Sequence, residues 1–270
     1  LLRDTEVIDD AEYMVMESVY GNRNHESHEE RDQKLDRVLL QTLRYGGTVV
    51  IPAFSIERTQ VILYSINNLI ESGKIPSVPV FLDSPLATKA TAIYKSNEDL
   101  LNDKARTQIA GGDDIFNFKT LTIIGNSQES AAIHTIKGSK VIIAGSGMSV
   151  GGRVISHEKY YLGDPNSTIL FVGYQAAGSL GRRIQDGEKN IDIQGQKIHI
   201  TARIESIDGF SSHKDSEHLV EFVSRSSKTL KKVFVCMGEP ASESFLAQRI
   251  RDYLGIDAVV PENGDVISLE

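Results

Sequence analysis

Two short segments carry acidic and histidine side chains of the kind that move protons. Glu17 follows the apolar run Tyr13–Met16 and precedes a glycine turn and His25. α/β folds place their chemistry at the carboxyl ends of strands, which is where Glu17 would stand. His213 lies two residues before Asp215 at the expected start of a helix, a pattern typical of a general acid with an orienting carboxylate. Taken singly, a capped turn or a helix cap with an exposed histidine explains each segment slightly better.

Two glycine-rich segments, each between an apolar run and a helical pattern, indicate anion binding. Gly145–Arg153 reads GSGMSVGGR, and Gly173–Arg183 reads GYQAAGSLGRR. Glycines let backbone N–H groups approach an anion closely, and the helix N-terminus that follows adds positive potential. The first segment has neither the Lys-Ser/Thr of a P-loop nor the Rossmann glycine spacing. An ordinary strand–turn–helix joint is the alternative for both segments.

The elements that would position these segments alternate along the chain. Candidate strands are Tyr13–Met16, Thr48–Pro52, Val78–Leu82, Thr120–Ile124, Lys140–Ala144, Thr168–Val172, Ile198–Ile204 and Lys232–Cys236. Helical patterns cover Glu29–Tyr45, Arg58–Ser72, Thr88–Leu101, Ser216–Ser226 and Ser242–Leu254, whereas Lys104–Asn117 is predicted to be a loop or a broken helix. Several strands are near-continuous apolar runs, which indicates cover on both faces. The pattern predicts an α/β fold with a mostly parallel sheet.

Composition narrows the classes of partner. The 270 residues include 40% hydrophobic and 24% charged residues, enough for one large globular domain or two ordinary ones. The net charge of −8 means that a nucleic acid must be held by local basic groups. The single cysteine, Cys236, excludes an internal disulfide and cysteine zinc cages, and fits a cytoplasmic location. No run approaches the ~18 apolar residues of a membrane span, so we expect no membrane partner.

Seven ordered segments are together more specific than any one alone. They are ESVYGNRNHE at Glu17–Glu26, IPAFSIERTQ at Ile51–Gln60, FLDSPLA at Phe81–Ala87, GSGMSVGGR at Gly145–Arg153, VGYQAAGSLGRR at Val172–Arg183, DGFSSHKD at Asp208–Asp215 and MGEP at Met237–Pro240. In this order they resemble the β-CASP branch of the metallo-β-lactamase superfamily. These RNA-processing nucleases include bacterial ribonuclease J and the endonuclease of polyadenylation complexes.

The resemblance implies a fold, an activity and a cofactor. A β-CASP domain with helices on both faces of a parallel sheet, at residues 22–208, would be inserted into the C-terminal part of a metallo-β-lactamase αββα fold, at residues 1–21 and 209–270. The implied activity is hydrolysis of RNA phosphodiester bonds with two zinc ions. These ions are held mainly by an HxHxDH motif, which this sequence does not contain. We therefore expect the C-terminal two-thirds of such an enzyme, inactive and without bound metal on its own.

Residue roles are carried over only where the motifs match. Glu17 matches the acidic residue that orients the catalytic histidine, and His213 matches the histidine that protonates the leaving oxygen, with Asp215 beside it. Met237 stands where most members carry a histidine zinc ligand, and a thioether binds zinc more weakly than imidazole. Glu57 replaces a usually small residue.

RNA is the expected partner, and a homodimer is one option for the assembly. Phosphate contacts are expected from Ser84, Ser146, Gly147, Met148, Gly151, Arg153, Ser179 and Arg182. Binding through phosphate contacts depends little on the RNA sequence and weakens as the salt concentration rises. One alternative is a non-catalytic RNA-binding paralogue or scaffold subunit, which Met237 favours and the retained Glu17 and His213 oppose. A second is an unrelated phosphate-binding α/β enzyme.

Overall fold

The computed structural model describes residues 1–269, which form two compact units. The large unit consists of Leu1–Arg3 and Glu26–Ser211, and the small unit consists of Asp4–His25 and Ser212–Glu270. Along the chain, the large unit is therefore an insertion into the small one. The domain borders expected at residues 21/22 and 208/209 stay a prediction, because compactness alone does not define a domain. No helix of the described residues has the length and hydropathy needed to cross a membrane.

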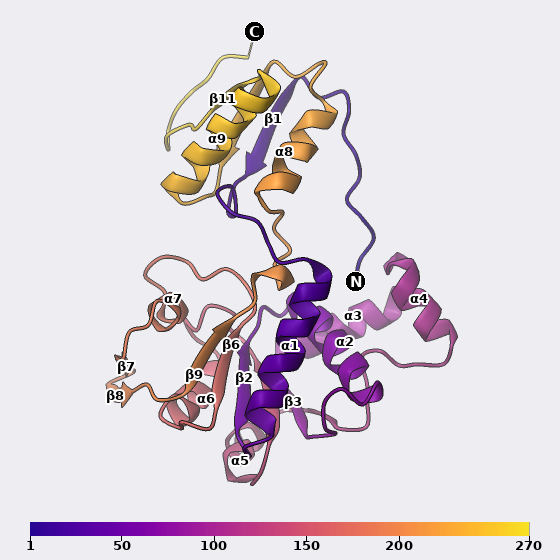
Figure 1. Cartoon of the computed structure of the whole chain (residues 1–270), viewed down its shortest axis with the longest axis vertical. Coiled ribbons are helices and arrows are strands. Elements are labelled where there is room, and N and C mark those ends of the chain that lie inside the picture. Colours follow the sequence, from indigo (N-terminus) through magenta and orange to yellow (C-terminus); the bar gives the residue numbers. More distant parts are fainter. Residues whose placement is uncertain (270) are drawn as a thin grey trace. The chain divides into compact units, whose positions relative to one another are not determined.

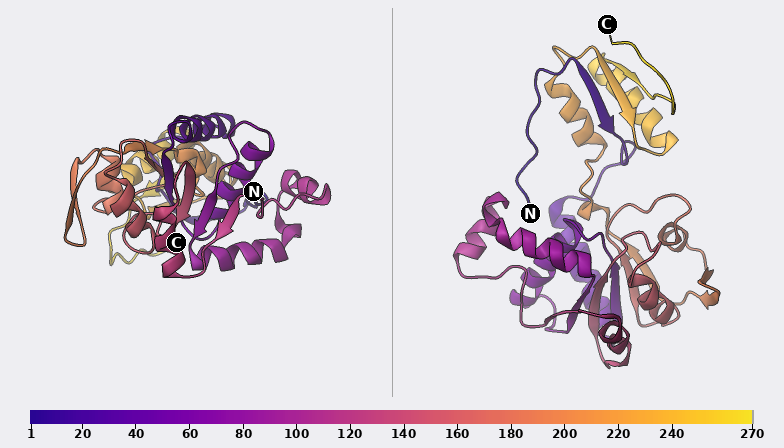
Figure 2. Two further views of the ribbon diagram at one scale, coloured as in Figure 1. Left: turned by 90° about the horizontal axis from the view of Figure 1, so that it is seen from below. Right: turned by 180° about the vertical axis from the view of Figure 1, so that it is seen from behind.

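A six-stranded parallel sheet organises the large unit (Figure 1). Its order is β4 (Leu121–Ile123), β3 (Val80–Asp83), β5 (Lys140–Ala144), β2 (Thr48–Pro52), β6 (Thr168–Phe171) and β9 (Arg203–Ser206). A separate antiparallel hairpin, β7 (Asn190–Ile193) and β8 (Gln196–His199), stands out from the rest of this unit (Figure 2). The central strands β2, β3, β5 and β6 are fully buried, which explains their near-continuous apolar sequences.

Helices cover both faces of this sheet. The helices are α1 (His28–Leu43), α2 (Arg58–Glu71), α3 (Pro85–Ser96), α4 (Asp103–Ala110), α5 (Ser127–Ala132), α6 (Val154–Tyr161) and α7 (Leu180–Gln185), with 3₁₀ turns at Glu98–Leu100, Ile133–Thr135 and Asp208–Phe210. Val49 and Ile51 of β2 pack in one core with α1 and α2, whereas Val50 packs in a second core with α6 and α7. The alternation follows from the two-residue period of a strand.

The carboxyl ends of the central strands lie at one edge of the sheet. Pro52 and Asp83 both pair in register with Ala144, so β2, β3 and β5 end side by side. The loops that follow them therefore start next to one another, and in an open α/β sheet this edge is where ligands bind.

The small unit has a three-stranded parallel sheet, in the order β1 (Tyr13–Glu17), β10 (Lys232–Cys236) and β11 (Asp257–Val259). Helices α8 (Ser216–Arg225) and α9 (Pro240–Leu254) share a core with Met14 and Met16 of β1. Val15, which points to the opposite face of the same strand, is 74% exposed. Only one face of β1 is therefore covered within this unit.

The predicted α/β class with a parallel sheet and helices on both faces is confirmed. The prediction of a single strand at Ile198–Ile204 was wrong, because these residues are divided between the hairpin strand β8 and the edge strand β9 of the large sheet. Lys104–Asn117 contains a regular helix, α4, whose N-cap Asn102 accepts a hydrogen bond from Ala105 N–H. The N-cap residue is a sequence signal for the start of a helix, but the glycine pair at the other end of the segment led us to expect a loop or a broken helix.

Candidate catalytic pair and phosphate-binding loops

Glu17 and His213 meet in the small unit. Glu17 is the last residue of β1, and His213 lies in the loop before α8. The Nδ1 atom of His213 is 3.4 Å from Oε1 of Glu17, and the two side chains are 45% and 25% exposed. The pair predicted from separate motifs is thus brought into contact at a place open to solvent, as a group that exchanges protons with a substrate requires.

The carboxyl group of Glu17 is held in its ionised form. Burial raises its pKa, but the contact with His213 and the hydrogen bond from Val19 N–H to Oε2, 2.7 Å long, lower it more, and the net pKa lies below its usual value. A carboxylate can only accept, so Nδ1 of His213 carries the hydrogen of this contact. The other ring nitrogen, Nε2, is the atom of this pair positioned for proton transfer to a substrate.

His25 holds the backbone beside this pair. Its Nε2 atom is 2.9 Å from the carbonyl oxygen of His213, and since a carbonyl only accepts, Nε2 carries the hydrogen. The His25 ring packs edge-on against the fully buried Tyr20, at 4.3 Å between ring centroids. The guanidinium of Arg23 covers the same tyrosine ring at 4.7 Å. His25 is therefore a positioning residue for the loop of His213, a role that its place in ESVYGNRNHE did not reveal.

Asp215 caps helix α8. Its Oδ1 atom accepts hydrogen bonds from the backbone N–H and the Nδ1 of His218, and its Oδ2 accepts one from the backbone N–H of His25. Burial raises the pKa of Asp215, but these hydrogen bonds lower it more. The contacts are those of a helix cap that also ties down the His25 segment, and a direct part in catalysis stays a prediction.

Met237 follows β10 in an unusual backbone conformation. Its φ is 61°, in the region that favours glycine, and 76% of the residue is exposed. Within residues 1–269, no group of three or more His, Cys, Asp or Glu side chains is arranged to hold a metal ion.

The loop Gly145–Arg153, called the β5 loop below, is folded tightly at the carboxyl edge of the large unit. Ser146 N–H donates to the Gly151 carbonyl, and Val150 N–H donates to the Ser146 hydroxyl. Among the described residues, no acceptor receives the N–H groups of Gly147 and Met148. Two adjacent N–H groups without acceptors are the kind of donor set that binds a phosphate oxygen.

Arg153 anchors the β5 loop instead of standing free for a phosphate. Its guanidinium bonds the carboxylate of Asp83 at 2.5 Å and the carbonyls of Ile124 and Gly125. Asp83 is completely buried and also accepts from Ser130 and from His157, which is itself fully buried. Burial raises the pKa of Asp83, but these three donors lower it more. A carboxylate ending the apolar strand VFLD was the sequence signal for this cluster.

Gln175 joins the β5 loop to the second glycine segment. Its Nε2 atom donates to the carbonyls of Gly147 and Gly173, and Gly181 N–H donates to the carbonyl of Met148. A Cβ on Gly181 would stand 1.9 Å from Oε1 of Gln175, so only glycine allows this approach. The two predicted phosphate loops are thus joined by hydrogen bonds, and Gln175 was missed because no local sequence pattern marks it.

The remaining predicted phosphate residues have different structural roles. Ser84 and Ser179 accept the capping hydrogen bonds of α3 and α7, and Arg182 pairs with Asp186 on the exposed side of α7. Gly151 lies in the β5 loop with open space where a Cβ would stand. An ion pair exposed to solvent is weak, so a phosphate could compete with Asp186 for Arg182.

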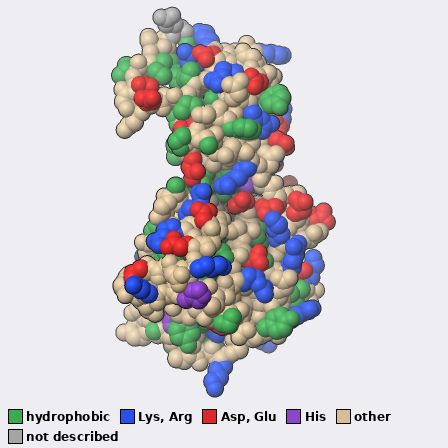
Figure 3. All heavy atoms as spheres, turned by 60° about the vertical axis from the view of Figure 1, so that its left-hand side comes forward, with side chains coloured by type: hydrophobic (Ala, Val, Ile, Leu, Met, Phe, Trp, Pro, Cys, Tyr) green, Lys and Arg blue, Asp and Glu red, His purple; other side chains and the backbone are tan. Residues whose placement is uncertain are grey.

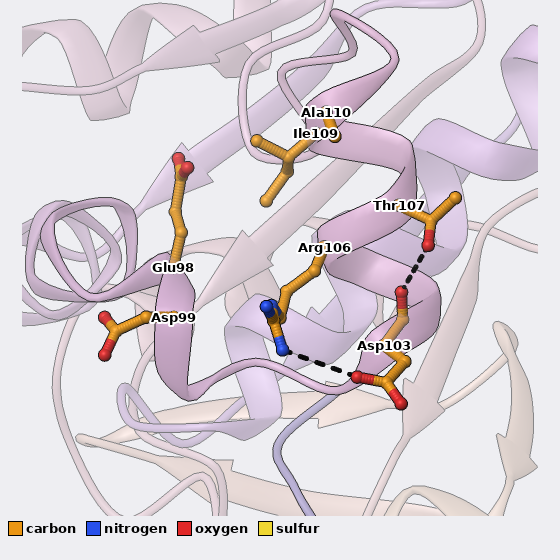
Figure 4. Close-up of a pocket in the computed structure, with 7 residues that line it drawn as sticks. All are labelled: Glu98, Asp99, Asp103, Arg106, Thr107, Ile109 and Ala110. Atoms are coloured by element: carbon orange, nitrogen blue, oxygen red, sulfur yellow. Dashed lines mark hydrogen bonds and ion pairs between the residues drawn. The ribbon is translucent and has the colours of Figure 1, made fainter.

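Neither surface charge nor cavity size singles out these places. Figure 3 shows basic and acidic side chains intermixed over the visible face, so this face presents no broad basic patch. A cavity of about 600 Å³ lies along α4, where Arg106 pairs with Asp103 and where Glu98 and Asp99 stand opposite (Figure 4). It contains none of the motif residues.

Two family models match the chain in sequence order. The first is described as the Beta-Casp domain and matches residues 59–184, and the second is described as the Zn-dependent metallo-hydrolase RNA specificity domain and matches residues 197–261. The chain belongs to the β-CASP family. The resemblance inferred from its motifs is confirmed, and zinc dependence is part of the description of the matched β-CASP-associated domain.

Named relatives in the β-CASP family are longer proteins. The chain is 34% identical to "Transcription termination factor FttA" of Pyrococcus abyssi, over 96% of the chain and 41% of the relative. It is 32% identical to "Ribonuclease TTHA0252" of Thermus thermophilus, over 79% of the chain and 49% of the relative. It is 33% identical to an "RNase J-like protein" of Methanocaldococcus jannaschii, over 97% and 60%. The chain thus spans about half the length of the relatives it matches.

Proposed function

We propose that this chain is the β-CASP and RNA specificity part of a zinc-dependent ribonuclease that hydrolyses RNA phosphodiester bonds. The observation that carries the proposal is the contact between Glu17 and His213, 3.4 Å apart in the small unit. The two residues come from separate motifs, and their contact leaves the imidazole side chain 45% exposed, where a substrate can reach it. The relatives named as a ribonuclease and as RNase J-like support the same substrate.

In the proposed reaction, Nε2 of His213 gives a proton to the oxygen that leaves phosphorus. Glu17 fixes the ring orientation, because the pKa of Glu17 is lowered and its carboxylate stays ionised near neutral pH to accept from Nδ1. His25 holds the His213 backbone at the same time. The N–H groups of Gly147 and Met148 hold phosphates of the strand. Two zinc ions belong to the proposal but would be held by residues outside these 270, and this chain alone would be inactive.

A second candidate is an RNA-binding protein that has lost catalysis. Met237 favours it, because an exposed thioether with φ of 61° stands where the family usually has a histidine. This candidate predicts that the full-length protein binds RNA without cleaving it. Replacing Met237 by histidine would then raise metal occupancy without creating cleavage.

The test compares variants of the full-length protein in an RNA cleavage assay, with zinc measured by elemental analysis. His213→Ala should lower the cleavage rate by ~10²–10⁴-fold, the usual contribution of a general acid, with unchanged zinc content and RNA affinity. His199→Ala, an exposed histidine on hairpin strand β8, is the matched control. Loss of zinc in His213→Ala would contradict the proton-donor role. Equal rates for wild type and His213→Ala would contradict the proposal as a whole.

Location and assembly are also proposals. We propose a cytoplasmic protein, which the single cysteine supports because disulfides are rare there. The homodimer stays a prediction, and light scattering of the full-length protein across a concentration series would decide it.

A further inference from the structure

A hollow of about 420 Å³ opens at the carboxyl edge of the large unit, and its walls are apolar on one side. Phe54 and Ile56 come from the loop after β2, and Leu86 comes from the start of α3. These residues are 40%, 66% and 60% exposed, although each is large and hydrophobic. Ser146 and Gly147 of the β5 loop also line the hollow. Three exposed apolar residues from two segments gathered in one hollow mark a binding surface.

Phe54 is held firmly in this hollow. Its carbonyl accepts hydrogen bonds from the N–H and the hydroxyl of Thr59, at 3.2 and 2.8 Å. A Cβ on Gly147 would stand 2.7 Å from Cδ2 of the Phe54 ring, so the ring lies directly against the Gly147 backbone. The glycine of the β5 loop thus makes room for an aromatic side chain that remains partly exposed.

A strained turn presents Ile56 to the same hollow. Glu57 has φ of 62° and ψ of −57°, and Arg58 N–H bonds the Ile56 carbonyl at 2.7 Å. This is the rare γ-turn with positive φ, in which a non-glycine residue is strained. Glu57 is also the residue that replaces the usually small residue of its motif. Strain retained at this point keeps an apolar side chain in solvent, which a purely structural loop would not require.

A pair of backbone N–H donors of the β5 loop lies at and next to the hollow. Gly147 lines the hollow, and the N–H groups of Gly147 and Met148 are those for which the described residues provide no acceptor. An occupant must therefore combine a flat apolar part with an adjacent anion. A protein partner does not fit, because a stable interface involves about 20–30 residues a side, far more than this hollow supplies.

We propose that this hollow takes one unpaired base of the RNA strand, stacked on Phe54 and flanked by Ile56 and Leu86, with the neighbouring phosphate on the N–H groups of the β5 loop. The inference rests on the proposed function, since it names how that RNA is held. Aromatic stacking accepts any base, because every base has an aromatic face. The site would therefore fix the position of the strand without reading its sequence.

The test measures the affinity of the full-length protein for a non-cleavable phosphorothioate oligoadenylate of about ten nucleotides at low salt. Phe54→Ala should weaken binding by about 5- to 150-fold, the contribution of one stacked base. Phe54→Tyr should restore it, and Leu86→Ser should weaken it as well. Ile93→Ala removes a side chain that is also exposed on α3 but does not line the hollow, and should leave binding unchanged.

A second probe separates the base from the phosphate. A set of oligonucleotides carries one abasic site each, at successive positions along the strand. Wild type and Phe54→Ala should bind with equal affinity only when the abasic site is at one particular position. Wild-type affinity for both Phe54→Ala and Leu86→Ser would overturn the base site and leave the proposed function standing. The same loss with a fully abasic strand would also overturn it. Absence of any salt-dependent binding by the wild type would overturn the proposed function and the base site together.

Discussion

Replacing Asp83 by alanine is the sharpest test of how the β5 loop is held. Asp83 is completely buried at the end of β3, and its two oxygens accept from Arg153, His157 and Ser130. Removal of one partner from a buried ion pair costs about 3–5 kcal/mol, because the other charge is left uncompensated. Arg153 is 22% exposed and keeps two carbonyl acceptors, which moderates the loss. We therefore expect destabilisation near the lower end, about 3 kcal/mol.

Thermal unfolding of the full-length protein, followed by circular dichroism, measures this change. For domains of this size, 1 kcal/mol shifts Tm by about 2–4 °C, so Asp83→Ala should lower Tm by about 6–12 °C. Hydrogen–deuterium exchange of the β3 and β5 amides assigns the transition to the large unit. Asp103→Ala is the matched control, because its ion pair with Arg106 is 3.4 Å long and its side chain is fully exposed. That control should stay within about 0.5 kcal/mol of wild type.

The pH dependence supplies the refutation. The pKa of Asp83 is lowered in the folded state, so its contribution is present above the unfolded value of ~3.9 and is lost as the pH falls through the folded value. The difference in the free energy of unfolding between wild type and Asp83→Ala should therefore become smaller only at acidic pH. A change below about 1 kcal/mol at pH 7, or one equal to that of Asp103→Ala, would refute the anchoring role of the Asp83–Arg153 pair.

Three further predictions concern Glu158, Gly181 and His25. Burial raises the pKa of Glu158 to about 7, so the ionised form destabilises the fold as the pH rises above the unfolded value, and Glu158→Gln should raise Tm at pH 8 relative to wild type but not at pH 5. Equal Tm differences at both pH values would contradict this. Gly181→Ala should cost about 1–3 kcal/mol in urea unfolding, because its Cβ would strike Gln175 at 1.9 Å, whereas Gly163→Ala, with 3.9 Å of space, should cost far less. His25→Ala should lower the RNA cleavage rate, and His25→Gln should restore part of it, because the glutamine amide can still donate to the His213 carbonyl. A cleavage rate for His25→Ala equal to that of wild type would show that this hydrogen bond does not position His213.

Local sequence signals predicted most of the elements. The helical pattern at Arg58–Ser72 corresponds to α2, and the apolar run Lys140–Ala144 is β5 without a shift. These predictions succeed because periodicity and capping act within a few residues. They fail where two elements share one apolar run, as at Ile198–Ile204, because the break between β8 and β9 depends on which strand each half pairs with.

The pair Glu17 and His213 could be named from the sequence because each lies in a recognisable motif of the β-CASP family. The sequence by itself also determined the α/β class, since alternating strands and helices leave few other arrangements. Only the tertiary structure decided that Arg153 bonds Asp83 rather than standing free, that Gln175 joins the two glycine loops, and that Phe54 lies exposed beside Gly147. The physical reason is that these contacts join residues far apart in the sequence, such as Phe54 and Gly147. They follow from the register of the parallel strands, which no local sequence pattern encodes.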